Sequence, residues 1–312
     1  MPGINQLSWP TIKRIVRLIF AVFAAGFVVL VIKDMSTKFQ GIETPIAWPW
    51  VGLSVVPTML AVLFQYEAWR ALIINWSGQR IPRLISLRIY VDAQIARYTP
   101  GKVGLPAVRV AGAPLLGLSP QIMISTLLVE VLSWAACGTI MGGLIIYYQS
   151  DSVASTQIVS QFFGVLGAAS ALGLVVFVLV PRHLWPKRLI QMLSNAGTGP
   201  LVPWRVPLLQ LVHFLTSALG GLCLVLALDG SFRDGLYLGA VLCVAIVAGF
   251  LALLAPAGIG VREAMIALFA EPVLGAGGAV ALGLLARVVS LASELGLFVL
   301  FRVLTRKNET PS

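Results

Sequence analysis

The residues with the clearest chemical potential are charged side chains inside segments that are otherwise apolar. In the topology derived below, the ionisable residues at membrane depth are Asp92, Arg97, Lys102, Arg109, Glu130, Arg262, Glu263, Arg287 and Glu294. A charge at the centre of a membrane helix costs roughly 2.5–3.5 kcal/mol, so such residues must pair with one another or face water. Arginine binds phosphate through two parallel hydrogen bonds, and lysine supplies a point charge. An anion site and a set of internal ion pairs are therefore the two hypotheses for these side chains.

Two Pro/Gly-rich loops, YTPGKVG (98–104) and APAGIG (255–260), stand next to several of these charges. Their glycines free backbone N–H groups at the start of the helices that follow, about 103–116 and 261–270. A helix N-terminus has partial positive charge and attracts anions. We therefore expect an anionic head group to bind between the loops. The expected binding residues are Arg97, Pro100, Gly101, Lys102, Gly104, Arg109, Pro256, Gly258, Gly260, Arg262 and Glu263.

The remaining charges are expected to form ion pairs that couple the helices: Asp92, Glu130, Arg287 and Glu294. Glu130 and Arg287 occupy matching positions in two halves of the sequence and have opposite charge, which predicts a pair between symmetry-related helices. Glu294 lies seven residues after Arg287 on the same helix face, so it is a competing or third member of that pair. A buried acid such as Glu130 or Glu294 could also take up a proton.

The elements that must position these residues are those of a membrane protein. Of the 312 residues, 58% are hydrophobic and 11% are charged, and the mean hydropathy is +0.94. A soluble domain cannot bury so much apolar surface. The stretches long enough to cross about 30 Å of hydrocarbon are 15–32, 46–69, 120–147, 156–181, 206–228 and 274–301.

Two further apolar stretches, 84–116 and 236–270, are interrupted by the Pro/Gly loops. Each is either one broken crossing or a hairpin that enters the membrane and returns. Hairpins place most basic residues in cytoplasmic segments, as the positive-inside rule requires, whereas a crossing at the first loop moves the basic segment 182–205 outside. We therefore predict an all-α polytopic membrane protein with six transmembrane helices, two re-entrant helical hairpins and cytoplasmic termini. The stretch 236–254 is nevertheless long enough to span alone.

The order of elements occurs twice along the chain. PGKVGLP (100–106) aligns with PAGIGVR (256–262), and LLVEVLSWA (127–135) aligns with LLARVVSLA (284–292). The halves 14–147 and 156–304 each have three crossings, an odd number, which predicts an inverted-topology repeat. Residues 1–312 then form a single integral membrane domain. The basic segment 182–205 is expected to connect the halves as an amphipathic helix on the cytoplasmic surface.

Other functions find little support in the sequence. The three cysteines lie in apolar runs without metal-ligand spacing, and the two histidines are far apart in this topology, so we expect no metal and no cofactor. No GxxxxGK[ST] pattern for nucleotide binding occurs. The net charge of +10 fits cytoplasmic loops of a membrane protein better than nucleic acid binding.

The sequences ARYTPGKVGLPAVRVAGAPLLGLS (96–119), followed by Glu130, and APAGIGVREAMIALF (255–269), followed by Arg287, resemble a known pair of motifs. They are similar to those of the flippase-like transmembrane family of lysylphosphatidylglycerol synthases, over essentially the whole chain. The resemblance implies a protein that moves lipids or lipid-linked head groups between leaflets. Family members occur alone or fused to soluble transferases. In the family, two glycines commonly follow the proline of each loop. This sequence has Gly101-Lys102 in the first loop and Ala257-Gly258 in the second. No transferase domain follows residue 312, so we expect no enzyme activity.

Together these features lead us to expect a flippase or scramblase of a bacterial cytoplasmic membrane. Its cargo is expected to be an anionic lipid, either a phospholipid or a polyprenyl-phosphate-linked lipid. A secondary transporter of a small anion and a non-transporting scaffold for an envelope-biosynthesis enzyme are the alternatives. The sequence leaves the lipid, the driving force and the oligomeric state open.

Overall fold

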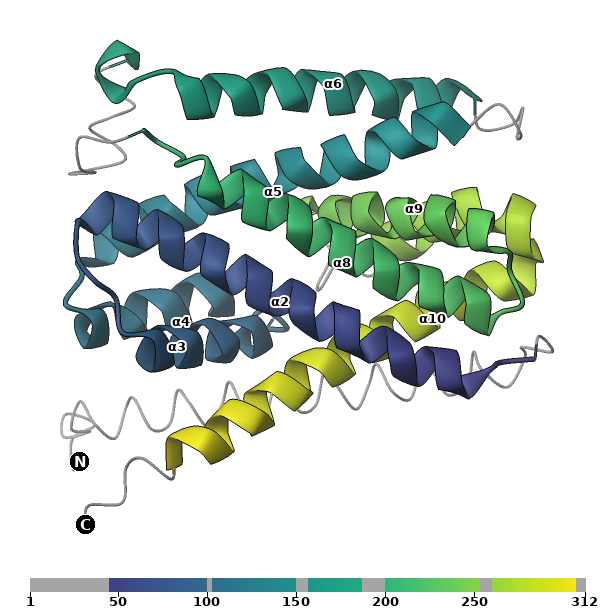
Figure 1. Ribbon diagram of the computed structural model, residues 1–312, viewed down its shortest axis with the longest axis horizontal. Coiled ribbons are helices and arrows are strands. Elements are labelled where there is room, and N and C mark those ends of the chain that lie inside the picture. Colours follow the sequence, from purple (N-terminus) through teal and green to yellow (C-terminus); the bar gives the residue numbers. More distant parts are fainter. Residues whose placement is uncertain (1–44, 100–102, 150–156, 187–199, 253–259, 307–312) are drawn as a thin grey trace, which may run out of the picture.

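The computed structural model describes residues 45–99, 103–149, 157–186, 200–252 and 260–306. Within these ranges the regular elements are helices, and no strand is present (Figure 1). The α-helices are α2 Trp48–Ser77, α3 Arg83–Ala96, α4 Gly104–Gly112, α5 Pro120–Gln149, α6 Gln157–Leu179, α8 Arg205–Ala227, α9 Phe232–Leu251 and α10 Val261–Arg306. Two short 3-10 helices, η2 Ala113–Leu116 and η5 Arg182–Leu184, follow α4 and α6.

Six of the described helices, α2, α5, α6, α8, α9 and α10, are long and apolar enough to cross a membrane. Five predicted spans, those beginning at residues 46, 120, 156, 206 and 274, are confirmed as long apolar helices or parts of them. The predicted span 15–32 lies outside the described residues. The sixth helix is α9, which was predicted as one arm of a hairpin; its 20 residues rise about 30 Å, enough to cross on their own.

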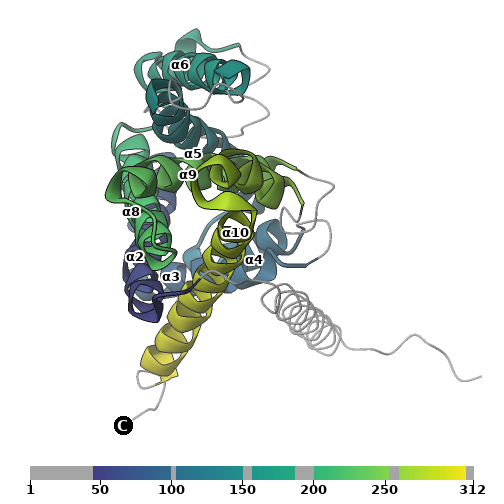
Figure 2. The same cartoon turned by 90° about the vertical axis from the view of Figure 1, so that its right-hand side faces the viewer.

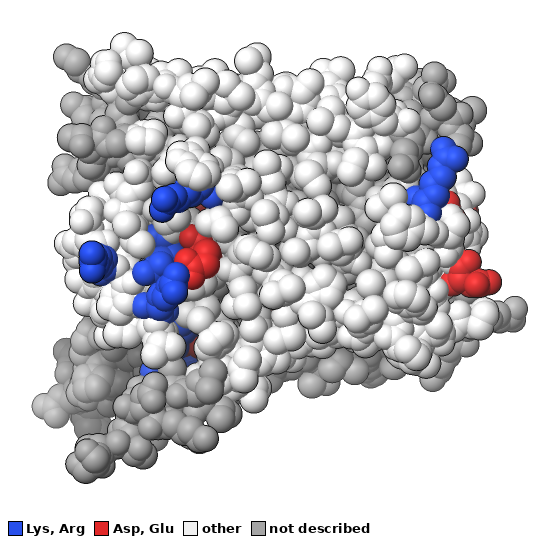
Figure 3. All heavy atoms as spheres, in the orientation of Figure 1, with Lys and Arg blue, Asp and Glu red and all other residues white. Residues whose placement is uncertain are grey.

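The surface is that of an integral membrane protein. In Figure 3 the charged side chains gather toward the two ends of the long axis, and a broad uncharged band separates them. Large apolar side chains are exposed on several helices, among them Leu53, Leu60, Phe162, Val165 and Leu172. Water would disfavour so much exposed apolar surface, whereas lipid tails solvate it.

The helices α3 and α4 form a short antiparallel pair on either side of the first Pro/Gly loop. They contain 14 and 9 residues and rise only about 21 and 14 Å, less than the hydrocarbon thickness of about 30 Å. A methyl group on Gly104 would lie 2.1 Å from the carbonyl oxygen of Ala96, so the close approach of the two helices requires glycine. The N–H group of Gly104 donates to Thr99 Oγ1 at 3.1 Å, so it is engaged within the hairpin.

The helix α10 changes direction at Gly275, where φ is 72° and ψ is 169°. Only glycine adopts this conformation readily. The part before the bend packs against α9, with Ile266 and Phe269 in the same apolar core as Leu238 and Val241. The part after the bend runs on to Arg306. Figure 1 shows α9 and the first part of α10 toward one end of the long axis, and α3 and α4 toward the other.

The two halves of the sequence interlock instead of folding side by side. The helices α2 and α8 pack along each other, α5 packs against α9, and α10 packs against α3. Figures 1 and 2 both show α6 at the edge of this bundle, where α5 is its main neighbour. Gly142 on α5 and Gly220 on α8 let partner helices approach closely, because a methyl group there would meet Val244 at 2.2 Å or Thr58 at 2.7 Å. Small residues allow such contacts in membrane bundles.

The end of the connector 182–205 is anchored in the bundle instead of lying on its surface. Leu201 and Val202 are fully buried in a cluster with Leu72 and Trp76 of α2. The indole N–H group of Trp76 donates to the carbonyl of Leu201 at 2.9 Å. The prediction of a surface helix is therefore wrong for this end, because its apolar side chains fill a gap beside α2; residues 187–199 lie outside the described ranges.

Candidate functional site

A buried ion pair joins α4 to α5 in the first half. The guanidinium of Arg109 bonds Glu130, and the two side chains are 2% and 4% exposed. The guanidinium carbon also lies 4.8 Å from the ring centre of Trp69 and 4.9 Å from that of Tyr90. Glu130 accepts a second hydrogen bond from Gln65 Nε2 at 2.9 Å. This pair is enclosed by protein, so Arg109 acts as a structural cation in this conformation.

The predicted pair between Glu130 and Arg287 is wrong. Its two residues lie on α5 and α10, and α5 packs mainly against α6, α8 and α9. Each residue pairs instead with the short helical segment that follows the Pro/Gly loop of its own half. Glu130 bonds Arg109, and Arg287 Nη2 bonds Glu263 Oε1 at 2.8 Å. The two halves thus contain equivalent ion pairs of opposite polarity.

A third ion pair crosses from the first half to the second. Arg97, at the end of α3, bonds the nearly buried Glu294 of α10. The hydroxyl of Tyr98 donates to the other carboxylate oxygen of Glu294 at 3.0 Å. Glu294 is therefore the partner of Arg97 and not the third member of a pair with Arg287. The link holds α3 against α10.

Asp92 lies apart from this network. It bonds Arg302 at 3.1 Å in a pair whose side chains are both partly exposed, so Asp92 forms an ion pair that couples α3 to α10, as expected, with Arg302 as the partner that the sequence did not identify. The reason is that α3 and the second part of α10 run alongside each other, which brings Arg302 within reach. The predicted loop residues Pro100, Gly101, Lys102, Pro256 and Gly258 lie outside the described ranges.

The start of α10 collects the charges of the second half. Gly260 has a φ of 87°, and its N–H group donates to Glu263 Oε2 at 2.8 Å. The other carboxylate oxygen of Glu263 forms an ion pair with Arg287. The side chain of Glu263 is 34% exposed and that of Arg287 is 14% exposed. The sequence predicts an anion at this helix N-terminus, where the backbone dipole favours one. In this structure that anion is the carboxylate of Glu263.

Arg262 has no carboxylate within ion-pair distance among the described residues, and its buried Nε atom has no hydrogen-bond partner there. It lies near enough to Arg97, Glu263 and Arg287 to interact with their charges. The described cluster thus contains three arginines, which are Arg97, Arg262 and Arg287. It contains two carboxylates, those of Glu263 and Glu294. One positive charge remains uncompensated, which is the property expected of an anion site.

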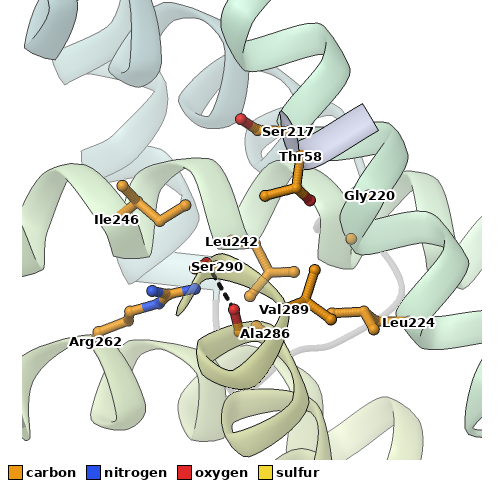
Figure 4. A pocket seen from close by; sticks show the side chains of 11 residues that line it. Thr58, Ser217, Gly220, Leu224, Leu242, Ile246, Arg262, Ala286, Val289 and Ser290 are labelled. Atoms are coloured by element: carbon orange, nitrogen blue, oxygen red, sulfur yellow. Dashed lines mark hydrogen bonds between the residues drawn. The ribbon is translucent and has the colours of Figure 1, made fainter. Parts of the chain in front are cut away.

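A small pocket adjoins Arg262 (Figure 4). It lies between α2, α8, α9 and α10, and its volume is about 40 Å³, room for about three water molecules or one group of the size of a phosphate. Figure 4 shows the guanidinium of Arg262 pointing toward the turn of α10 that carries Ser290, with Thr58 and Ser217 on the opposite wall. The pocket therefore combines one cation with hydroxyl groups from both halves on walls that are otherwise apolar.

Three residues of the pocket lie well inside the helices that carry them. Thr58 is ten residues from the start of α2, Leu242 ten from the start of α9, and Ser217 ten from the end of α8. Ten residues rise about 15 Å, half the hydrocarbon thickness. Trp48 and Trp50 are exposed at the start of α2, as aromatic residues at a membrane interface are. Thr58, Leu242 and Ser217 thus lie about half a hydrocarbon thickness from one end of their helices, the depth expected of a site at the bilayer midplane.

Several residues of the site were missed in the sequence. They are Thr58, Gln65, Tyr98, Ser217 and Ser290. The signal available was a polar side chain inside an apolar span, which is costly unless it has a partner. Hydroxyl residues give this signal weakly, because they also bond the carbonyls of their own helix, as Thr58 and Ser290 do here.

The chain is similar to a known family of membrane proteins. The model of the lysylphosphatidylglycerol synthase TM region matches residues 14–295. The matched range contains the three ion pairs around the Pro/Gly loops, the pocket and Arg262. A search of curated proteins gives no match.

Proposed function

Because the chain belongs to the lysylphosphatidylglycerol synthase transmembrane-region family, we propose that it is a lipid flippase or scramblase. Its cargo is an anionic phospholipid or a polyprenyl-phosphate-linked lipid. The head group passes through the interface between the halves while the acyl or prenyl tails stay in the bilayer. The chain itself carries out transport and no covalent chemistry.

The observation that carries this proposal is the uncompensated charge of Arg262 beside a midplane pocket. An unpaired cation at this depth is costly, so a protein that served only as a scaffold would gain stability by replacing it. A transporter of anions needs such a charge, because the head group otherwise faces the hydrocarbon barrier alone. The charge is most useful at the midplane, where that barrier is highest.

We further propose that the two hairpins are re-entrant and that the halves form an inverted-topology repeat. Three features support this. The helices α3 and α4 are too short to cross, whereas α9 has the length of a span and is assigned to a hairpin by its position, because the two hairpins lie toward opposite ends of the long axis. The packing is also reciprocal, because α9 of the second half lies on α5 of the first while α3 of the first half lies on α10 of the second. In this arrangement both termini are cytoplasmic and the membrane is a bacterial inner membrane.

The ion pairs suggest how the halves move. The Arg109–Glu130 pair stays within one half and is buried, so it keeps α4 fixed to α5. The Arg97–Glu294 pair joins the halves, and Arg97 is partly exposed. Rearrangement of this second pair is the step that changes access to the pocket from one leaflet to the other.

A second candidate, transport of a small soluble anion, is favoured by one observation. The pocket volume of about 40 Å³ is smaller than a lipid head group. A small anion fits the pocket as it stands, whereas a lipid head group requires the helices around the pocket to separate. Transport measurements with lipids and with phosphate distinguish the two candidates.

The test uses the full chain reconstituted into phosphatidylcholine vesicles that contain fluorescent phosphatidylglycerol or a fluorescent polyprenyl phosphate. A membrane-impermeant reductant quenches only the outer leaflet, so transport raises the quenched fraction from half to nearly all of the label. We expect rapid exchange with the wild type. Loss of a charge-assisted contact in Arg262→Gln should slow it by about tenfold or more.

Arg233→Gln is the matched control, because this arginine is exposed at the start of α9 and does not line the pocket. It should exchange lipid at the wild-type rate. If the wild type exchanges neither lipid faster than protein-free vesicles do, the flippase proposal is wrong. If the same vesicles instead release phosphate, the small-anion alternative replaces it.

A further inference from the structure

We propose that Glu263 is an internal stand-in for the ligand: its carboxylate occupies an anion site at the start of α10, and the phosphate group of the cargo displaces it. The inference names the group recognised at the site and rests on the proposed function only for the lipid as the source of that phosphate. Glu263 is thereby assigned a competing role and not a direct contact to the cargo.

The donors around Glu263 are those that a phosphate uses. One carboxylate oxygen accepts the N–H group of Gly260 at 2.8 Å, and the other accepts Arg287 Nη2 at 2.8 Å. A backbone amide at a helix N-terminus and an arginine form a common phosphate-binding combination. A carboxylate and a phosphate oxygen present the same kind of acceptor to these groups, so one replaces the other without new donors.

The balance of charge favours the exchange. Arg287 bonds the carboxylate of Glu263, and Arg262 lies near enough to both to interact with their charges but has no ion-pair partner of its own among the described residues. A phosphodiester brings the same single charge as Glu263 but is free to sit between both arginines. The side chain of Glu263, which the phosphodiester displaces, is already 34% exposed. Glu263 is therefore not enclosed by protein on every side, and its carboxylate has room to turn out of the site.

The equivalent pair in the first half shows what a permanent ion pair looks like in this fold. Glu130 is 4% exposed and bonds Gln65 as well as Arg109, so protein encloses it. Glu263 lacks such enclosure, although it also pairs with an arginine; in its own half it has the place after the loop that Arg109 has in the first half. From this difference we assign ligand exchange to the Arg287–Glu263 pair of the second half. The Arg109–Glu130 pair of the first half stays in place.

The experiment measures binding of inorganic phosphate and of a short-chain phosphatidylglycerol to the purified full chain by calorimetry and by the ligand-induced rise in unfolding temperature. We expect Glu263→Gln to bind both ligands about three- to tenfold more tightly, because the competing charge is removed. We expect Arg262→Gln to bind them at least about tenfold more weakly. Glu271→Gln, which neutralises an exposed glutamate of the same helix, should bind as the wild type does.

If Glu263→Gln binds phosphate no more tightly than the wild type, the stand-in role is excluded. A loss of stability in this variant does not obscure the result, because the ligand-induced rise is compared with each variant's own unliganded unfolding temperature. If Glu263→Gln does not fold, Glu263→Asp replaces it: the charge is kept but withdrawn from Arg287. Binding by Glu263→Asp should be about twofold tighter than in the wild type, and unchanged or weaker binding excludes the proposal.

The two ligands separate this inference from the proposed function. Tighter binding of phosphate and of the phospholipid by Glu263→Gln supports both. Tighter binding of phosphate alone supports the stand-in role and contradicts the lipid as cargo. Lipid exchange in vesicles with no effect of Glu263→Gln or Arg262→Gln on binding supports the flippase and overturns the site. Dibutyrylglycerol, which lacks the phosphate, should bind none of the variants.

Discussion

The ion pairs Arg109–Glu130 and Arg287–Glu263 show how surroundings decide what a charged residue does. The first is held between two aromatic rings and a glutamine, and its members are almost inaccessible. Two charges in such a site have paid a large desolvation cost, and removing one leaves the other buried without compensation. The second pair is not fully enclosed by protein, so one member has room to leave. The same residue types therefore serve stability in one half and exchange in the other.

This contrast predicts a large difference in stability between single substitutions. Arg109→Gln should lower the free energy of unfolding by about 3–5 kcal/mol, because Glu130 keeps its charge in a buried site. Arg302→Gln, which breaks the partly exposed pair with Asp92, should cost less than about 1 kcal/mol. Unfolding of both variants in detergent, followed by circular dichroism, measures the difference. Equal stability of the two variants would contradict the structural role of Arg109.

The identity of the important charges could be predicted from the sequence, but their partners could not. A charge inside an apolar span is visible without a structure, and this signal marked Arg97, Arg262 and Glu294. Which charge meets which depends on the neighbours of each helix, and similar positions in two repeats do not make two helices adjacent. The pair predicted between Glu130 and Arg287 failed for this reason. The hydroxyl groups of the pocket had no distinctive pattern at all.

At the scale of the elements, the hairpin of α3 and α4 depends on one close contact. Gly104 brings the start of α4 against the last turn of α3, and its N–H group bonds Thr99, which in turn bonds the Ala96 carbonyl at 2.9 Å. The hairpin places Arg97 at its tip, where it reaches Glu294 of α10. The position of this cross-half ion pair therefore follows from the packing at Gly104.

Gly104→Ala should disrupt this hairpin. The added methyl group would lie 2.1 Å from a backbone carbonyl oxygen, and relief of such an overlap typically costs about 1–3 kcal/mol. Gly173→Ala in α6 is the control, since a methyl group there meets nothing within 4 Å. Thermal unfolding should show the loss only in Gly104→Ala. Wild-type stability of this variant would mean that α3 and α4 are not packed as described.

The long spans were predictable because length and hydropathy alone define them. The arms around the second loop were harder to interpret. The helix α9 has the length of a full span, and α10 consists of two helical parts that meet at the non-helical Gly275. Neither hydropathy nor helical periodicity distinguishes a bent helix from two separate ones. The positive φ of Gly275 is a property of the folded backbone and was not evident among the 30 glycines of the sequence.

At the scale of the whole molecule, the account depends on two halves that exchange contacts across their interface. The α2–α8 packing places Thr58 of one half and Ser217 of the other on the same wall of the pocket, opposite Arg262 (Figure 4). A cavity shared in this way changes when one half moves against the other. The central claim is that the phosphate of a lipid head group binds at Arg262 during this movement.

A structure of the full chain in nanodiscs that contain phosphatidylglycerol tests this claim most directly. We predict phosphate density within hydrogen-bond distance of Arg262 and Arg287, near the midplane, with the carboxylate of Glu263 turned away toward water. The lipid tails should leave the protein between its helices and enter the surrounding bilayer. Lipid density found only on the outer faces of the bundle, with Glu263 still bonded to Gly260 and Arg287, would contradict the account.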